Sequence, residues 1–400
     1  MSLDRRAQAP GELRGLSIVC VGFADWDTEL WTNQHHLMSR LARHNDVLFI
    51  ESLGLRRPTL AGRDLRRILR RLTRALRLHR AADRLTVLSP LVLPIHRDGP
   101  VRKLNRALLR LQVGHAMRKL KMVHPILWGY VPQVEDLTET VRPRLLVYHC
   151  VDDIAAQPGV DRDSFQAAEQ RLAVRADLVI ASSKPLAERM SRLSPRVLYA
   201  PNVADVEHFR SALDPAPVDP AIAALPEPRI IFIGAISANK VDLELVAQLA
   251  RLRPQWSIAL VGPIGPGEPA TDVSMLASRP NIHLIGWRRH DQLPALLRGA
   301  AAGLIPYAQN QLTASIFPMK VYEYLAAGLP VASTPLASLA DIPDVRVGAD
   351  AAELALILDE LLRADSPAER ARRSAAAESH SWESRISELA RAIAPLLKEG

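Results

Sequence analysis

Cysteine is scarce in this chain of 400 residues, which contains only Cys20 and Cys150. Each lies inside an apolar run with the pattern of a buried strand, so both are expected to be reduced, buried thiols. No group of cysteines and histidines has the spacing of a metal site. The sequence therefore argues against a disulfide scaffold, and we expect no bound metal ion.

Long hydrophobic runs are also missing, although 48% of the residues are hydrophobic. No run reaches the roughly 18 apolar residues that a membrane-spanning helix needs, and residues 1–10 are charged rather than arranged as a signal peptide. We expect a cytoplasmic protein that neither spans a membrane nor is exported. Its length suffices for two domains, each with a core of its own.

Acidic residues are rare between Arg56 and Arg84, a segment that contains eleven arginines but only two aspartates, Asp64 and Asp83. Within this segment apolar residues recur at helical spacing with arginines on the other side, which predicts a basic amphipathic helix. Such a helix can lie on an anionic membrane, where each basic group contributes about 1 kcal/mol. An ordinary surface helix is the alternative. Nucleic-acid binding is not expected, because few aromatic residues are interleaved with the charges and no nucleic-acid motif is present.

Strand-like and helical patterns alternate along the chain, which predicts an α/β fold of two Rossmann-like, doubly wound domains. The expected strands cover residues 16–23, 47–52, 85–88, 125–128, 145–150, 178–181, 197–199, 229–233, 257–261, 282–284, 302–305 and 329–333. The expected helices cover about 34–43, 102–121, 163–175, 184–193, 242–252, 292–298 and 318–327. Five prolines within 214–228 predict a linker, with one domain over 1–213 and the other over 214–380.

The most informative segment is the predicted helix that begins near Pro318 and stops at Gly328. Free backbone amides of Phe317, Met319 and Lys320 at its start favour an anion such as a diphosphate, and Lys320 adds a positive charge. Glu323 lies about 7–8 Å further along the helix axis, which approximates the span from a nucleotide's phosphates to its ribose. A core helix with a solvated glutamate is the alternative interpretation.

The motif Pro-x-Lys-x-x-Glu-Tyr-Leu-Ala-Ala-Gly-x-Pro-Val, residues 318–331, resembles the donor-site signature of nucleotide-sugar glycosyltransferases of the GT-B fold. In particular it resembles the large retaining family, group 1 or family-four-like, that builds bacterial polysaccharides. The resemblance implies two Rossmann-like domains facing across a cleft, with a last helix over 381–400 that crosses back onto the first domain. It assigns ribose binding to Glu323. Many relatives carry a second glutamate near the transferred sugar where this chain has Ser315.

A second phosphate-binding segment is expected in the turn after the strand 229–233. There Gly234 and Lys240 match a glycine and a lysine of the family's Gly-Arg-x-x-x-x-Lys pattern, whereas Ala235 stands in place of the arginine. Lys240 would then act on the diphosphate together with the start of the 318–327 helix, or Arg288 would substitute for the missing arginine. A surface lysine after a turn is the alternative.

Five further residues are candidates for donor contacts on the strength of their positions. The resemblance places Trp287 and Arg288 beside the nucleotide base, although Trp287 could serve only in packing. Tyr307, Asn310 and Thr313 precede the donor helix in a polar loop and could meet the sugar, with turn formation as the alternative.

The first domain is expected to supply the acceptor side. An apolar strand ends in His149, Asp152 and Asp153, and either aspartate or the histidine could take the proton of an acceptor hydroxyl. The alternative is that His149 packs in the strand and Asp153 caps the next turn.

Nearer the amino terminus, aromatic and polar residues lie between the first strand and the first helix. Trp31 offers a flat face for a sugar, and Gln34 and His35 offer polar contacts. Some relatives instead have an Arg-Pro pair at Asn33 and Gln34. Ordinary helix packing is the alternative.

Together these features predict a metal-independent enzyme that transfers a sugar from a nucleotide diphosphate to a glycan or lipid-linked acceptor in bacterial polysaccharide synthesis. No cofactor is expected beyond the donor substrate itself. Retention of configuration is implied by the resemblance, and inversion with an aspartate base stays open. Two other hypotheses are a nucleotide-sugar epimerase of the same fold and a non-catalytic membrane adaptor that uses the Arg56–Arg84 segment.

Overall fold

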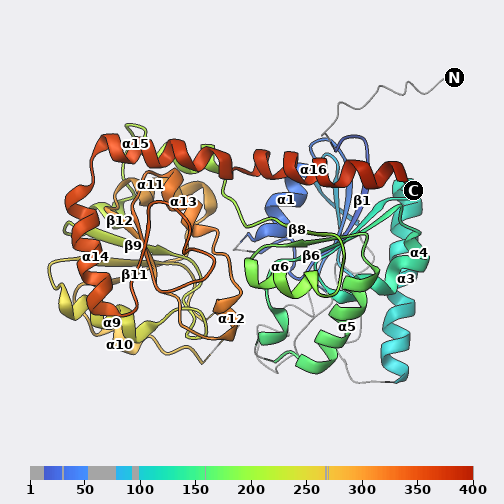
Figure 1. Cartoon of the computed structure of the whole chain (residues 1–400), viewed down its shortest axis with the longest axis horizontal. Coiled ribbons are helices and arrows are strands. Elements are labelled where there is room, and N and C mark those ends of the chain that lie inside the picture. Colours follow the sequence, from blue (N-terminus) through green and yellow to red (C-terminus); the bar gives the residue numbers. More distant parts are fainter. Residues whose placement is uncertain are drawn as a thin grey trace. The chain divides into compact units, whose positions relative to one another are not determined.

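A computed structural model describes residues 13–28, 31–52, 78–91, 99–157, 159–265, 268 and 270–399 (Figure 1). The chain divides into two compact units. Unit 1 contains residues 1–200 and 386–400, and unit 2 contains residues 201–385. The basic helix predicted around Leu65–Leu76, within the Arg56–Arg84 segment, lies outside the described residues.

Unit 1 contains one sheet of eight strands in the order β3-β4-β2-β1-β5-β6-β7-β8. All neighbours pair in parallel except β3 and β4, which are antiparallel. The strands are β1 (Ser17–Val21), β2 (Asp46–Ile50), β3 (Leu78–Ala82), β4 (Leu85–Leu88), β5 (Ile126–Gly129), β6 (Leu145–Cys150), β7 (Leu178–Ala181) and β8 (Val197–Tyr199). The helices are α1 (Asn33–Leu41), α3 (Pro100–Leu120), α4 (Thr138–Val141), α5 (Arg162–Arg175) and α6 (Lys184–Ser191).

Unit 2 contains a sheet of six parallel strands in the order β11-β10-β9-β12-β13-β14. The strands are β9 (Arg229–Ile233), β10 (Ser257–Val261), β11 (Ile282–Gly286), β12 (Ala302–Ile305), β13 (Val331–Ser333) and β14 (Val345–Val347). The helices are α7 (Val206–Arg210), α8 (Pro220–Ala223), α9 (Leu243–Leu252), α10 (Ser274–Ala277), α11 (Leu293–Arg298), α12 (Gln311–Ala314), α13 (Lys320–Ala326), α14 (Ala351–Ala364) and α15 (Pro367–Ala376). The predicted class, α/β with two doubly wound Rossmann-like sheets, is confirmed.

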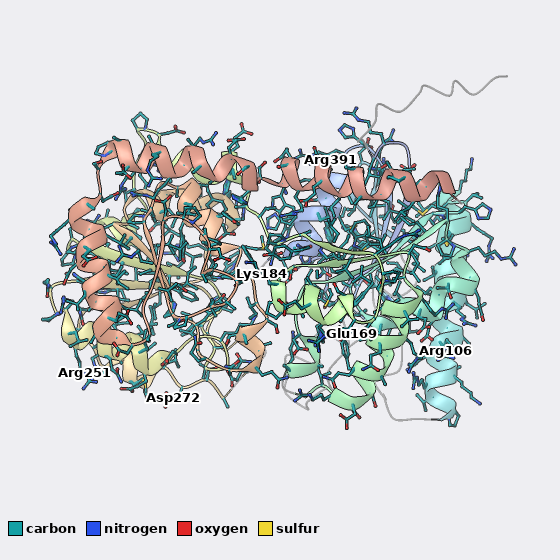
Figure 2. The ribbon with its side chains drawn as sticks, in the orientation of Figure 1. Arg106, Glu169, Lys184, Arg251, Asp272 and Arg391 are labelled. Atoms are coloured by element: carbon teal, nitrogen blue, oxygen red, sulfur yellow. The ribbon has the colours of Figure 1, made fainter. Side chains whose placement is uncertain are left out.

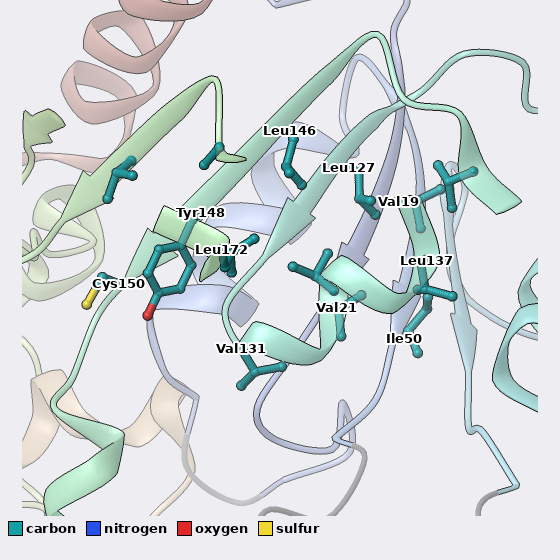
Figure 3. Close-up of a cluster of buried hydrophobic side chains, with 14 of the residues drawn as sticks. Val19, Val21, Ile50, Leu127, Val131, Leu137, Leu146, Tyr148, Cys150 and Leu172 are labelled. Carbon is teal, nitrogen blue, oxygen red and sulfur yellow. The ribbon is translucent and has the colours of Figure 1, made fainter. Parts of the chain in front are cut away.

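The core of unit 1 explains why its strands read as continuous apolar runs. The strands β1, β5 and β6 are central in the sheet, and every residue of β5 and β6 is buried. Figure 3 shows side chains from these strands, among them Val19, Leu127 and Leu146, next to Leu137 and to Leu172 of α5. Both faces of a parallel sheet are covered by helices, so alternation with polar residues is absent.

The proline-rich stretch 214–228 is part of unit 2. The guanidinium of Arg298, the last residue of α11, donates hydrogen bonds to the carbonyl oxygens of Ser211, Asp214 and Pro217. These bonds hold the stretch within unit 2, where the sequence predicted a linker near a domain boundary. The units divide after Ala200, thirteen residues before the boundary predicted from the sequence.

The last helix, α16 (Trp382–Glu399), begins in unit 2 and continues in unit 1 from Ile386. Within unit 1 the carbonyl oxygen of Leu397 accepts a hydrogen bond of 3.0 Å from Arg144. Among the helices in the described part of the chain, none has both the length and the apolar character needed to cross a membrane.

Candidate functional site

Two glycines end neighbouring strands of the unit 2 sheet. Gly234 follows β9 with a φ of 152°, and Gly262 follows β10 with a φ of 149°. A methyl group added at Gly262 would lie 1.9 Å from the carbonyl oxygen of Gly234, and one added at Gly234 would lie 2.4 Å from Cε of Lys320. Glycine at both positions therefore gives the Lys320 side chain room at the carboxyl edge of the sheet.

Lys320, the first residue of α13, lies between two aromatic rings at this edge. Its Nζ atom is 5.6 Å from the ring centre of Phe232 and 5.9 Å from that of Tyr307, both within the range of cation–π attraction. Desolvation disfavours the charged form, but the nearby oxygens of Tyr307 and Glu323 outweigh it, and the pKa of Lys320 is raised. The ammonium group is therefore positively charged at neutral pH.

Glu323 lies three residues after Lys320 and thus on the same side of α13. Its side chain is half-buried, and its carboxylate has no hydrogen-bond partner among the described residues. Burial raises the pKa of this carboxyl, and the lowering effect of Lys320 only partly offsets it. A carboxylate in this setting is available to accept hydrogen bonds from ligand hydroxyl groups.

The start of α13 differs slightly from the prediction. The helix begins at Lys320 rather than Pro318, because the preceding turn closes through a bond from the Val321 amide to the Pro318 carbonyl oxygen. The amides of Phe317, Met319 and Lys320 have no acceptor in the described part of the chain. These three N–H groups are the ones that the sequence predicted to be free.

Tyr324 fixes α13 against the sheet. Its hydroxyl oxygen accepts a hydrogen bond of 2.8 Å from the amide of Ile233, the last residue of β9. Its ring lies on Gly303 of β12, where an added methyl group would come within 2.4 Å of Cδ2. Because Tyr324 follows Lys320 by one helical turn, this anchor also sets the position of the lysine.

The predicted phosphate turn joins this site. The Lys240 carbonyl oxygen accepts a hydrogen bond of 2.9 Å from Ala308, and Val241 pairs with Tyr307. The Lys240 ammonium is partly exposed and forms no ion pair with a described acidic residue. The structure thus brings the loop that carries Lys240 to the loop that carries Tyr307, beside Lys320.

Asn310 and Thr313 form a local helix cap. The Asn310 side chain accepts a hydrogen bond from the Thr313 amide, and the Thr313 hydroxyl donates to the Ala308 carbonyl oxygen and accepts from the Asn310 amide. Thr313 is buried, so a sugar cannot reach its hydroxyl. The predicted sugar contact of Thr313 is therefore corrected to a capping function, because both hydroxyl partners lie inside the protein.

Arg288 and Trp287 follow β11, and Ser315 directly follows α12, which ends at Ala314. The Arg288 guanidinium donates to the Ile285 carbonyl oxygen at 3.0 Å and lies 3.7 Å from the Asp219 carboxylate. It is therefore held toward Asp219, which weakens the expectation that it replaces the arginine missing at Ala235. Trp287 is 38% exposed.

In unit 1, the carboxyl end of β6 meets a buried cluster of charged and polar side chains. Glu169 of α5, labelled in Figure 2, accepts a hydrogen bond of 2.5 Å from the Tyr148 hydroxyl. Arg189 of α6 lies 3.2 Å from Glu169 and 3.1 Å from Asp153. Burial raises the pKa of Glu169, although Arg189 acts in the opposite direction. The same burial raises the pKa of the Cys150 thiol well above its usual value.

This cluster changes the assignment of the predicted catalytic residues. Asp153 is 4% exposed and paired with Arg189, so it is poorly placed to take a proton from a substrate. His149 is 2% exposed and stacks on Tyr130 with ring centres 4.9 Å apart. Asp152, which is half-buried, is the more accessible of the two aspartates.

The predicted acceptor residues lie at the start of α1. Trp31 is 43% exposed and stacks on His35 with ring centres 5.9 Å apart. Gln34 is fully buried, and its side-chain oxygen accepts a hydrogen bond of 2.9 Å from the Phe23 amide. Of these three residues, Trp31 alone presents a substantial surface, so the contacts expected of Gln34 and His35 are instead made within the protein.

His35 is held as a neutral imidazole. Its Nε2 donates to the Asp25 carbonyl oxygen at 3.0 Å, and its Nδ1 accepts from the Thr32 amide at 3.1 Å. Desolvation lowers the pKa of His35 to about 4. The contacts with Asp25 and Thr32 raise this pKa, but their effects are smaller. The sequence could not show this, because a histidine near a helix start has no signature of burial.

The pKa of His35 predicts acid-sensitive stability in unit 1. Between pH 6.5 and 4 the unfolded chain binds a proton at this histidine and the folded chain does not, so stability falls as the pH falls through that range, by about 3 kcal/mol. The nearby Trp26 and Trp31 allow unfolding to be followed by fluorescence. His35→Gln should flatten the pH dependence, and an unchanged pH profile in that variant would contradict the assignment.

Several residues of these clusters were missed from the sequence. Glu169 and Arg189 are the main ones in unit 1, and Tyr324 and Gly262 in unit 2. A signal for Glu169 was present, since it follows Phe165 by four residues and precedes Leu172 by three on the buried face of α5.

No group of three or more potential metal-ligating side chains occurs in the part of the chain that the structure describes.

Residues 227–364 match the family described as Glycosyl transferases group 1. A Bacillus subtilis (strain 168) protein named for teichuronic acid biosynthesis, the glycosyltransferase TuaH, is 29% identical over 228 residues, which are 53% of this chain and 56% of that protein. The match thus spans about half the length of this curated relative.

Solved structures resemble the whole chain. Sucrose-phosphate synthase from Thermosynechococcus elongatus has a TM-score of 0.69 at 16% identity, covering 96% of this chain and 100% of that one. Anabaena Alr3699/HepE in complex with UDP has a TM-score of 0.65 at 14% identity, covering 95% and 100%. At these identities the likeness establishes the fold, which is GT-B. The resemblance stated from the sequence is supported, because residues 227–364 match the group 1 glycosyltransferase family.

Proposed function

We propose that this protein transfers a sugar from a nucleotide-diphosphate donor to a glycan or lipid-linked acceptor in the synthesis of a bacterial cell-surface polysaccharide. The observation that carries the proposal is the position of Lys320 over Gly234, with Glu323 three residues later on α13, within the matched range 227–364. The name of the Bacillus subtilis relative supports the polysaccharide context. The structure of Alr3699/HepE in complex with UDP-glucose supports a donor of this class.

In the proposed mechanism, donor binding uses the charges of unit 2. Lys320, with Lys240 on the neighbouring loop, offsets the negative charge that develops on the departing diphosphate. The amides of Phe317 and Met319 add neutral donors beside Lys320. Glu323 accepts hydrogen bonds from the ribose hydroxyls, which positions the nucleotide. Because two lysines supply the positive charge, the proposed reaction needs no metal ion.

For the acceptor, the exposed face of Trp31 offers a stacking surface, and Asp152 is a base for an inverting reaction. In a retaining reaction the departing phosphate would itself take the acceptor proton. The proposal places the enzyme on the cytoplasmic side of the membrane, with a peripheral contact expected from Arg56–Arg84.

The test uses purified protein with nucleoside diphosphates and their sugars in the presence of EDTA. Thermal stabilisation by a nucleoside diphosphate, followed by transfer or hydrolysis of the matching nucleotide sugar, is the expected result. Glu323→Ala should weaken donor binding by about 10- to 150-fold, because hydrogen bonds to a charged group contribute about 1.5–3 kcal/mol. Lys240→Ala should lower the rate of transfer.

Glu360→Ala is a suitable control, because Glu360 is a surface residue of α14 whose ion pair with Arg346 is exposed. Full activity in the Glu323 and Lys240 variants would reject the site assignment. Isomerisation of the sugar without any acceptor would instead identify an epimerase. Absence of any nucleotide binding would favour the adaptor hypothesis.

A further inference from the structure

The outer face of α3 combines exposed leucines with cations, and the donor and acceptor sites do not use it. Leu104 is 48% exposed and Leu111 is 69% exposed. The helix contains no acidic residue, and its basic residues are Arg102, Lys103, Arg106, Arg110, Arg118 and Lys119. A helix of this composition has a net charge of +6 if its histidine is neutral.

The two faces of α3 differ in what they contact. Leu109, Val113 and Ala116 belong to the core of unit 1. The exposed positions 104, 107, 111, 115 and 118 recur at helical spacing on the other face. Leu104 and Leu111 lie two turns apart, or about 10 Å along the axis. Figure 1 shows α3 at the edge of unit 1, and the residues of its opposite face pack into the core of that unit.

Five of the six cations of α3 fall into two groups. Arg106, labelled in Figure 2, lies 2.9 Å from Asp136, and Arg110 lies 2.8 Å from Glu139, so these two are used within unit 1. Lys103, Arg118 and Lys119 are exposed and form no ion pair with any described acidic side chain. Lys103 adjoins the leucines at one end of the helix, and the other two follow them at its carboxyl end.

We propose that this face of α3 docks on an anionic phospholipid membrane. Leu104 and Leu111 would enter the boundary between headgroups and acyl chains, while Lys103, Arg118 and Lys119 would contact lipid phosphates. Unpaired cations beside exposed leucines are complementary to a surface that is anionic outside and apolar beneath. Nucleic acid would satisfy the charges but leave the leucines in water, so it fits the face less well.

The experiment measures binding of the full chain to vesicles of phosphatidylglycerol and phosphatidylcholine, and to vesicles of phosphatidylcholine alone. Binding is expected only with the anionic lipid, and it should weaken as salt is added. Lys103→Glu with Lys119→Glu should reduce the partition coefficient by at least about 25-fold, since each basic group near the surface contributes about fivefold. Leu104→Ser with Leu111→Ser should reduce it by about tenfold or more.

Matched controls are available elsewhere on the chain. Leu252→Ser with Leu356→Ser changes two leucines of unit 2 that are 44% and 61% exposed. Arg192→Glu with Arg363→Glu changes the net charge equally at exposed positions. Both controls should bind vesicles nearly as the parent does.

Three results would overturn the proposal. One is full vesicle binding by the α3 variants, which would direct attention to Arg56–Arg84 or another surface. Another is loss of binding in the charge variant but not in the leucine variant, which would indicate a purely electrostatic contact. The third is absence of vesicle binding by the parent protein, including the case in which it binds only nucleic acid.

Discussion

Replacement of Arg189 by methionine is expected to destabilise unit 1 by roughly 3–5 kcal/mol at neutral pH, because it removes the cation from a buried pair of carboxylates. Arg189 contacts both Glu169 and Asp153, which are 3% and 4% exposed. Methionine retains much of the packing volume, so the charge is the main change. The loss is large because two acids remain without their counterion.

The pH dependence of this effect identifies its cause. Burial already raises the pKa of Glu169 in the parent protein, and removal of Arg189 should raise it further. A carboxyl whose pKa is raised on folding contributes stability below its unfolded pKa and loses it as the pH rises through the folded pKa. The destabilisation by Arg189→Met should therefore shrink as the pH is lowered toward about 4.5.

The two cysteines supply a readout specific to unit 1. Cys20 and Cys150 are both buried there, and burial raises the pKa of each thiol, so reaction with a disulfide reagent requires opening of this unit. Arg189→Met should label much faster than the parent, and Arg192→Met, which changes an exposed neighbour, should not. Partial recovery in Arg189→Met with Glu169→Gln would confirm the electrostatic cause. Equal labelling of Arg189→Met and parent would contradict it.

Parallel strands were the part of the fold that the sequence predicted best. Val47–Ile50 and Leu145–Cys150 are buried on both faces, and such runs stand out as continuous apolar segments. The strands β3 and β14 were missed because they lie at sheet edges, where partly exposed residues such as Leu78 and Val345 give no clear alternation.

The helices α14 and α15 were missed for a different reason, since their signals are in the sequence. Asp350 caps α14 and Ser366 caps α15, each accepting a hydrogen bond from an amide three residues on. Neither helix belongs to a motif with chemistry. The residue at which the two units divide was also not predicted correctly. Prolines indicate a loop, but they do not show which unit that loop packs against.

Candidate residues in unit 2 were predicted better than those in unit 1. Gly234, Tyr307, Lys320 and Glu323 lie at one edge of the sheet. The order of the strands and the spacing of residues along α13 determine these positions, and both can be inferred from the sequence. In unit 1, by contrast, the acidity of Asp153 suggested catalysis, whereas its partner Arg189 lies 36 residues away on another helix. A pairing over such a separation leaves no local trace, and so the sequence could not distinguish a buried ion pair from an active-site acid.

Replacement of Lys320 by alanine is expected to lower kcat/KM for the nucleotide sugar by about 10²–10³-fold, if the proposed donor site is correct. The ammonium is held beside Phe232 and Tyr307, so its charge is placed before the donor arrives and little reorganisation is needed. Arg251→Ala, a change of one exposed cation on α9, should have little effect on kcat/KM.

Gly234→Ala should produce a similar loss by displacing Lys320, since the new methyl group would lie 2.4 Å from Cε and 2.7 Å from Nζ of the lysine. Combining Gly234→Ala with Lys320→Ala should then cost little more than Lys320→Ala alone, because the shortened side chain no longer occupies the space that the methyl group needs. Steady-state kinetics of the two single variants and the double variant measure this coupling. If the losses of the two single variants simply add in the double variant, Gly234→Ala does not act through the position of the ammonium. Its effect would then come from the backbone at residue 234, where a φ of 152° is strained for alanine.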